Sequence, residues 1–123
     1  MTLDRLTITF SWPDKKLWPN DKNGKAWMSY QAEKVRARDE GYWSTKKALG
    51  ANSIQLQSRT PTKVTFVFPD RRNRDIEGCI GAIKHHIDGI AKALGVDDRI
   101  FRPWTVDDAL DAKGKGLVIV EIG

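Results

Sequence analysis

The chain has 123 residues, a formal net charge of +5 and 40% hydrophobic residues, including five tryptophans. This size and composition favour a single folded domain spanning residues 1–123 and exclude a disordered chain. No apolar run approaches the ~20 residues that cross a bilayer, and the single cysteine, Cys79, excludes an internal disulfide. We therefore expect a cytoplasmic protein without membrane association, with Cys79 packed among apolar neighbours.

The first half of the chain predicts a strand, a loop and a long helix. Apolar and polar residues alternate over residues 3–12, which is typical of a strand with one buried face. Residues 13–26 contain two prolines, two asparagines and a glycine, and they are predicted to form a loop. A helix is predicted over residues 29–49. Its packing residues are expected to be Tyr30, Val35, Tyr42 and Trp43, with Trp27 as a core anchor just before it.

The second half begins with a predicted strand over residues 62–68 and a helix over residues 76–94. The helix carries an apolar stripe at helical spacing, and Gly95 is a suitable residue to end it. The stripe consists of Ile76, Ile80, Ile83, Ile87, Ile90 and Leu94. His85 and His86 are adjacent on this helix and therefore diverge, so we expect surface histidines rather than a shared metal site.

The C-terminal residues predict two more strands, over residues 99–106 and 117–122, with a turn at residues 113–116 between them. The element order is therefore β-α-β-α-β-β. This order predicts an α/β (α+β) domain with a mixed sheet and two main helices packed on it.

Charge is distributed unevenly along the chain. Basic residues outnumber acidic ones in residues 13–47 and 59–74, whereas acidic residues outnumber basic ones in residues 75–111. A basic surface around a small acidic centre would produce this layout and would suit a nucleic-acid-binding protein. Small basic domains without such a role can show the same blocks.

Asp75 and Glu77 are candidate metal ligands at the start of the predicted helix 76–94. Both carboxylates can point toward one position if the helix begins between them, and clustered carboxylates are the usual protein ligands of Mg²⁺. The alternative is structural, because Asp is a preferred N-cap and Glu in the first turn complements the helix dipole.

A third acid, Asp98, lies just beyond the far end of the same helix. A helix of about 20 residues is ~30 Å long. Asp98 can therefore reach Asp75 only if the chain doubles back, if the helix breaks near Gly89, or if the acids meet across a subunit interface. Asp97 and Asp98 are equally at home in an ordinary loop.

Basic residues near these acids are candidate DNA ligands. Arg71, Arg72 and Arg74 directly precede Asp75. Guanidinium groups suit bidentate capture of phosphate, although these three can also pair with the acids. Lysines Lys22 and Lys25 are interleaved with tryptophans in the predicted loop, which suits a DNA-contacting arm.

Lys84 lies two helical turns after Glu77 on the same face. It could hold a scissile phosphate or stabilise charge in the transition state. The alternative is an ion pair with Asp88, four residues further along the helix.

The segment from Phe68 to Glu77, Phe-Pro-Asp-Arg-Arg-Asn-Arg-Asp-Ile-Glu, resembles the arginine-rich signature of the RusA-like Holliday junction resolvases. In that family a strand ends in Pro-Asp, and a basic run then leads to Asp-x-Asp-Asn at a helix start. A Gly-containing turn and an Asp-Asp pair follow the helix, here Gly95-Val96-Asp97-Asp98. Matches at Leu17-Trp18-Pro19-Asn20, at Trp27 and at the closing Lys113–Gly116 extend the resemblance over nearly the whole chain.

The resemblance implies a homodimeric, Mg²⁺-dependent crossover junction endodeoxyribonuclease of phage or prophage origin, acting in the bacterial host cytoplasm in DNA recombination and repair. Mn²⁺ is expected to substitute for Mg²⁺, and the substrate is a four-way DNA junction. By position, Asp75, Glu77 and Asp98 match the family's essential acids, which implies that they converge. Helix geometry adds Lys84 as a candidate for the family's catalytic lysine.

The chain departs from the family pattern at three positions. Glu77 stands where the family has Asp, Gly78 stands where it has Asn, and Gly81 takes the place of a lysine that some members carry. Three alternatives therefore stay open: a junction- or branched-DNA-binding protein that has lost cleavage, a broader nuclease for flaps and forks, and a basic domain with no role on DNA.

Overall fold

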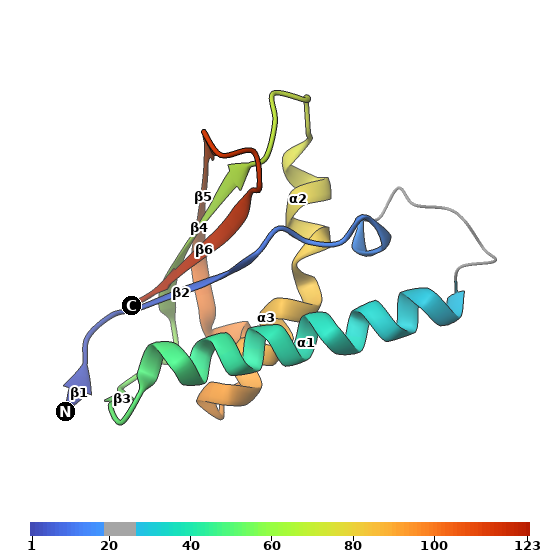
Figure 1. Ribbon diagram of the computed structural model, residues 1–123. Coiled ribbons are helices and arrows are strands. Elements are labelled where there is room, and N and C mark those ends of the chain that lie inside the picture. The colour runs from blue at the N-terminus through green and yellow to red at the C-terminus, as the bar shows by residue number, and fades with distance from the viewer. Residues whose placement is uncertain (19–26) are drawn as a thin grey trace.

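The computed structural model describes residues 1–18 and 27–123, and this part of the chain folds into three α-helices and two β-sheets (Figure 1). The α-helices are α1 (Trp27–Leu49), α2 (Ile76–Ala82) and α3 (Lys84–Leu94), and the 3₁₀ helices are η1 (Lys15–Leu17) and η3 (Asp98–Ile100). The strands are β1 (Thr2–Leu3), β2 (Leu6–Ser11), β3 (Ser53–Ile54), β4 (Thr60–Phe68), β5 (Phe101–Leu110) and β6 (Leu117–Ile122).

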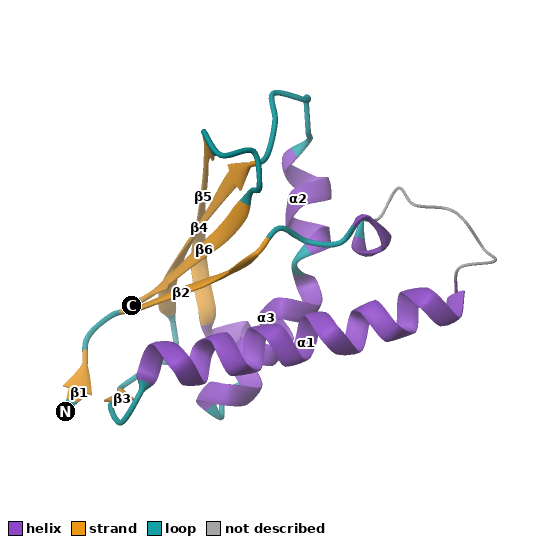
Figure 2. Cartoon of the chain, viewed as in Figure 1, coloured by secondary structure: helices purple, strands orange, loops and turns teal. Residues whose placement is uncertain are grey.

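The main sheet has the strand order β2-β6-β4-β5 (Figure 2). Strand β6 is antiparallel to both β2 and β4, whereas β5 is parallel to β4. A parallel pair requires a crossover connection, which α2 and α3 supply. Strands β1 and β3 form a separate short parallel pair. The mixed sheet with helices packed on it confirms the predicted α/β (α+β) class.

One face of the main sheet is buried, and the other is not. Along β2 and β6, buried residues alternate with exposed or half-buried ones, as the apolar alternation predicted. Isoleucines from α3 and from the bend before it join these buried strand residues in one hydrophobic cluster. The strands and helices therefore share a single core, which makes them one domain.

The prediction of one continuous helix over residues 76–94 is wrong. The helix is interrupted at Ile83, where the backbone leaves helical geometry (φ −104°, ψ 7°), and α2 and α3 run in different directions on either side (Figure 1). Ile83, Ile87 and Ile90 are nevertheless all buried. The apolar stripe therefore identified these three residues correctly, but Ile80 and Leu94 are only half-buried and Ile76, at the start of α2, is 46% exposed, so its predicted place on the buried face is wrong. Gly95 ends α3 in a left-handed conformation, as predicted (φ 70°).

Helices α1 and α3 pack with their backbones in close contact. A Cβ atom at Gly41 would overlap the carbonyl oxygen of His86, and one at Gly89 would overlap that of Arg38. We call this contact around Gly41 and Gly89 the helix junction. Because it is built on small residues, the large side chains of α1 lie elsewhere. The predicted packing roles of Val35 and Trp43, and the predicted core position of Trp27, are wrong, since all three side chains are exposed.

The C-terminal strands and the turn between them lie close to where they were predicted. Strand β5 extends four residues beyond the predicted end at residue 106, and the turn at residues 113–116 is confirmed by hydrogen bonds to the side chain of Asp111. Cys79 is buried, as expected. Within the described residues, no helix has the length and apolar composition needed to cross a membrane.

Candidate nucleic-acid interface

The loop between β4 and α2 is organised by Asp70. Its Oδ1 atom accepts a hydrogen bond from the backbone N–H of Arg72 (2.9 Å) and forms an ion pair with Nη2 of Arg74 (3.0 Å). The hydrogen bond from Arg72 and the adjacent guanidinium of Arg74 lower the pKa of Asp70. Asp70 therefore stays ionised and holds the loop in shape. We call residues 70–74 the arginine loop.

The three predicted DNA-binding arginines of this loop have different environments. Arg74 is 11% exposed, and its guanidinium lies 5.3 Å from the ring centres of both Trp12 and Phe68. It is therefore a supporting residue, anchored by cation–π contacts and by Asp70. Arg71 and Arg72 are exposed, and Arg72 approaches Asp70 only to 4.0 Å. These two guanidinium groups are available to a ligand.

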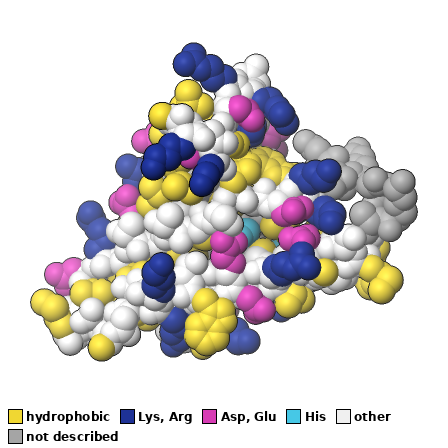
Figure 3. Space-filling view, viewed as in Figure 1, with side chains coloured by type: hydrophobic (Ala, Val, Ile, Leu, Met, Phe, Trp, Pro, Cys, Tyr) yellow, Lys and Arg dark blue, Asp and Glu magenta, His cyan; other side chains and the backbone are white. Residues whose placement is uncertain are grey.

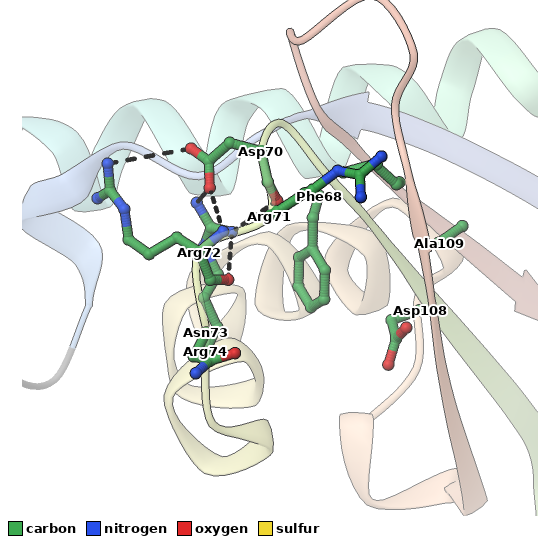
Figure 4. A pocket seen from close by; sticks show the side chains of 9 residues that line it. Phe68, Asp70, Arg71, Arg72, Asn73, Arg74, Asp108 and Ala109 are labelled. Carbon is green, nitrogen blue, oxygen red and sulfur yellow. Dashed lines mark hydrogen bonds and ion pairs between the residues drawn. The ribbon is translucent and has the colours of Figure 1, made fainter.

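The arginine loop lines a shallow pocket of about 420 Å³ with the end of β5. Figure 4 shows Arg71 and Arg72 extending in opposite directions from the loop, while Asp108 lies across from it on β5. The parallel register that places Asp108 opposite Phe66 brings this end of β5 beside the loop. Asp108 was not among the predicted site residues. Its only sequence signal is the pair Asp107–Asp108, which interrupts the apolar alternation of a strand.

Asp75 caps α2. Its backbone is extended (φ −83°, ψ 151°), and its Oδ1 atom accepts a hydrogen bond from the N–H of Gly78 at 2.5 Å. A Cβ atom at position 78 would crowd that same oxygen, so glycine suits the cap. Glu77 lies exposed in the first turn, where it complements the helix dipole. The structural role weighed for Asp75 is thus present, and it occupies one of the two carboxylate oxygens.

Asp98 lies at the other end of the sheet from Asp75. Because β4 and β5 are parallel, the segment that follows β4 and the segment that precedes β5 are at opposite ends. Asp98 has two other acids, Asp88 and Asp97, as neighbours. Partial burial raises the pKa of Asp98, and the negative charges of these two neighbours raise it further. Asp88 in turn lies 3.9 Å from Nδ1 of His85.

The convergence of three acids that the resemblance implies is not found within one chain. The described residues contain no group of three or more His, Cys, Asp or Glu side chains that could hold a metal ion. Asp75 and Glu77 follow the arginine loop, whereas Asp98 lies at the opposite end of the main sheet, just before β5. The break in the helix does not bring them together, because it lies at Ile83 and the chain still ends α3 away from the loop. Of the three arrangements considered, the one across two subunits is compatible with this geometry.

The predicted lysines are placed only in part. Lys84 is the first residue of α3 and is exposed. In the part of the chain that the structure describes, no ion pair joins it to Asp88, whose carboxylate lies 3.9 Å from Nδ1 of His85. Lys22 and Lys25 fall in residues 19–26 and so lie outside the described residues.

The expectation of surface histidines is wrong. His85 and His86 are buried because α3 is covered by α1 as well as by the sheet. His86 stacks on Phe10 with ring centres 4.2 Å apart, and its Nε2 atom donates to Glu40 at 3.3 Å. His85 lies 3.0 Å from the hydroxyl of Tyr30. Both histidines therefore tie α3 to α1, which is a structural role.

Glu40, which is half-buried, lies at the edge of this contact. Its Oε2 atom accepts hydrogen bonds from the backbone N–H (3.0 Å) and hydroxyl (2.6 Å) of Ser11. Partial burial alone would raise the pKa of Glu40, but the hydrogen bonds from His86 and Ser11 outweigh it and lower the pKa to about 2. The carboxylate is thus held ionised between α1, α3 and β2.

The comparisons with known proteins leave the family open. No family model matches the chain. The chain is 29% identical over 118 residues to an uncharacterized protein of Xylella fastidiosa (strain Temecula1 / ATCC 700964), and the match covers 94% of this chain and 74% of that protein. The chain is therefore similar, over nearly its whole length, to a bacterial protein.

Proposed function

We propose that this protein is an endodeoxyribonuclease of branched DNA, acting on four-way junctions, that holds the DNA backbone through the arginine loop. The observation that supports it most directly is the state of Arg71 and Arg72. Both guanidinium groups are exposed on a loop that Asp70 and Arg74 hold in shape, and that loop leads directly into Asp75. Exposed guanidinium groups on a preorganised loop suit phosphate. Basic side chains also gather at this upper end of the molecule (Figure 3).

Hydrolysis is proposed for the acids that follow the loop, Asp75 and Glu77, with Lys84 assisting at the phosphate. Mg²⁺, or Mn²⁺ in its place, is the proposed cofactor, because carboxylate oxygens are its usual protein ligands. One chain does not bring three acids together, so Asp98 would have to come from the second subunit of a homodimer. A two-fold axis can place opposite ends of two copies side by side, and it also matches a four-armed substrate. Phage or prophage origin and a cytoplasmic location belong to the same proposal.

The first experiment compares the native chain with Asp75→Asn on a synthetic four-way junction. Asparagine is as good an N-cap as aspartate, so this variant keeps α2 capped and removes only the charge. We expect metal-dependent nicking by the native chain and none by the variant, with equal binding of the junction. Equal nicking by both proteins would overturn the assignment of Asp75.

The second experiment tests the arginine loop with a matched control. Arg71→Ala plus Arg72→Ala is compared with Arg5→Ala plus Lys92→Ala, which removes the same charge from exposed residues outside the arginine loop. We expect the loop variant to weaken junction binding by roughly tenfold or more and to lower the salt dependence by about two phosphate contacts. The control is expected to retain most of the affinity. An equal loss in both variants would show attraction by net charge alone.

A second candidate function is junction binding without cleavage. It is favoured by the absence of a three-acid group within the described residues of one chain and by the use of one Asp75 oxygen in the helix cap. It predicts tight binding with no nicking in either Mg²⁺ or Mn²⁺. A panel that adds flaps and forks separates both candidates from a broader structure-specific nuclease.

A further inference from the structure

The long helix α1 carries large apolar side chains on the side away from its own core. Its buried residues are all small: Ala37, Gly41 and Thr45. Most of the exposed large hydrophobic residues of the described chain lie on this one helix, namely Trp27, Met28, Val35 and Trp43. A surface helix normally shows the opposite arrangement, with its apolar side inward. Exposed apolar surface gathered on one element is typical of an interaction site.

Most of these residues belong to one stripe. Residues three, four and seven apart lie on the same face of a helix. The exposed residues of α1 that follow this spacing, which we call the outer stripe, are Met28, Ala32, Val35, Arg36, Asp39, Trp43, Lys46 and Lys47. Met28 is 79% exposed and Trp43 is 66% exposed. Figure 3 shows hydrophobic side chains at the surface over α1, with charged ones between them.

We propose that the outer stripe is a self-association surface, on which α1 of a second copy packs in the antiparallel direction about a two-fold axis. In such an interface residue i faces residue j, and j faces i. An axis between residues 37 and 38, near the middle of α1, places Arg36 opposite the second copy's Asp39. The same axis places Trp43 opposite the second copy's Ala32, so that a large side chain meets a small one and the two surfaces can interdigitate. Each contact occurs twice.

The two charges at the centre of the outer stripe, Arg36 and Asp39, suit a second copy of the chain. Asp39 lies at the centre of the stripe, where its carboxylate would repel a phosphate backbone. Among the described residues Asp39 takes part in no ion pair, whereas Arg36 pairs with Glu33 on its own helix and stays 72% exposed. A second copy provides both charges with an opposite partner. The helix of 23 residues offers a contact about 34 Å long.

This inference concerns self-association and is argued from the surface of α1 alone, so it does not rest on the proposed nuclease activity. Association is measured without DNA or metal, so its failure is distinguishable from a failure of the nuclease proposal. The proposal would stand for a protein that binds junctions without cutting them.

The experiment measures the dimer dissociation constant of the full chain by sedimentation equilibrium, for the native protein and four variants. Asp39→Arg places like charges across the axis and is expected to weaken the dimer by about tenfold or more. The double variant Arg36→Asp plus Asp39→Arg exchanges the two charges and is expected to restore most of the native affinity. Trp43→Ser removes the large side chain and is expected to weaken the dimer. Asp4→Arg, the same change on an exposed acid outside α1, is the control and should dimerise like the native chain.

Several outcomes would overturn the proposal. They are a monomeric native chain, a dimer that neither Asp39→Arg nor Trp43→Ser weakens, and a double variant no better than Asp39→Arg. A monomer whose junction affinity falls with Trp43→Ser would instead assign the stripe to DNA. Thermal unfolding followed by circular dichroism is the control for folding. We expect each variant to unfold like the native chain, because all the substituted residues are exposed.

Discussion

The helix junction and the arginine loop both hold charged side chains in fixed positions, but only the arginine loop also carries charged side chains that stay exposed to solvent. At the junction, Glu40 accepts hydrogen bonds from Ser11 and His86, and the contact excludes larger residues at Gly41 and Gly89. In the loop, Asp70 and Arg74 satisfy each other and leave Arg71 and Arg72 exposed.

This difference separates charges that stabilise the fold from charges that are available to a ligand. A buried polar group must be paired within the protein, because leaving it without a partner costs free energy. An exposed guanidinium carries no such cost and adds little to stability. Substitutions in the two regions should therefore affect different measurements. Those at the helix junction should change the free energy of unfolding, whereas those at Arg71 and Arg72 should change the affinity for four-way DNA.

The largest expected effect is that of Gly89→Ala at the helix junction. The added Cβ would overlap the backbone of Arg38, and α1 would have to move away from α3. We expect the free energy of unfolding, measured with urea, to fall by about 3 kcal/mol or more. Gly95→Ala is the matched control, because no atom lies within 4 Å of its Cβ position and only its left-handed backbone (φ 70°) is affected. That control should cost about 1 kcal/mol. Equal losses in both variants would contradict close packing at the junction.

A smaller effect is expected within the arginine loop itself. Arg74→Ala removes the cation–π contacts with Trp12 and Phe68 and the partner of Asp70. We expect urea unfolding to show a loss of about 1–2 kcal/mol. Arg71→Ala should stay within about 0.5 kcal/mol of the native chain, because its side chain is exposed. If the two variants were equally stable, the distinction between supporting and ligand-binding arginines would fail.

The smallest effect is that of Glu40→Gln, and it depends on pH. The pKa of Glu40 is lowered from 4.5 to about 2 in the folded protein, so its contribution is full above pH 4.5 and is lost as the pH falls toward 2. The side chain is 36% exposed, so solvent screening reduces this contribution to about 1 kcal/mol at neutral pH. Urea midpoints measured from pH 7 to pH 2 should converge for the native chain and Glu40→Gln. A constant difference over that range would assign the effect to packing instead of charge.

The periodic patterns of the sequence predicted most of the fold. Alternation over residues 3–12, 62–68 and 117–122 corresponds to β2, β4 and β6, since a strand with one buried face requires a period of two. The isoleucine stripe likewise predicted that Ile83, Ile87 and Ile90 are buried, although it also included Ile76, which is exposed. It could not predict the bend at Ile83, because both halves keep the same spacing and only packing against α1 and the sheet requires two directions.

The candidate site shows the same division. The sequence determined its local parts: a strand end, a basic loop and an aspartate that caps a helix, each set by neighbours in the chain. Tertiary structure decided the rest. It buried Arg74 and both histidines, exposed Trp43, placed Asp108 beside the loop and separated Asp98 from Asp75. The positions of Asp108 and Asp98 depend on the parallel pairing of β4 with β5, and the burial of the histidines depends on the contact of α1 with α3. The burial of Arg74 depends on Trp12, which follows β2. These contacts join residues far apart in the chain, so no periodic pattern identifies them.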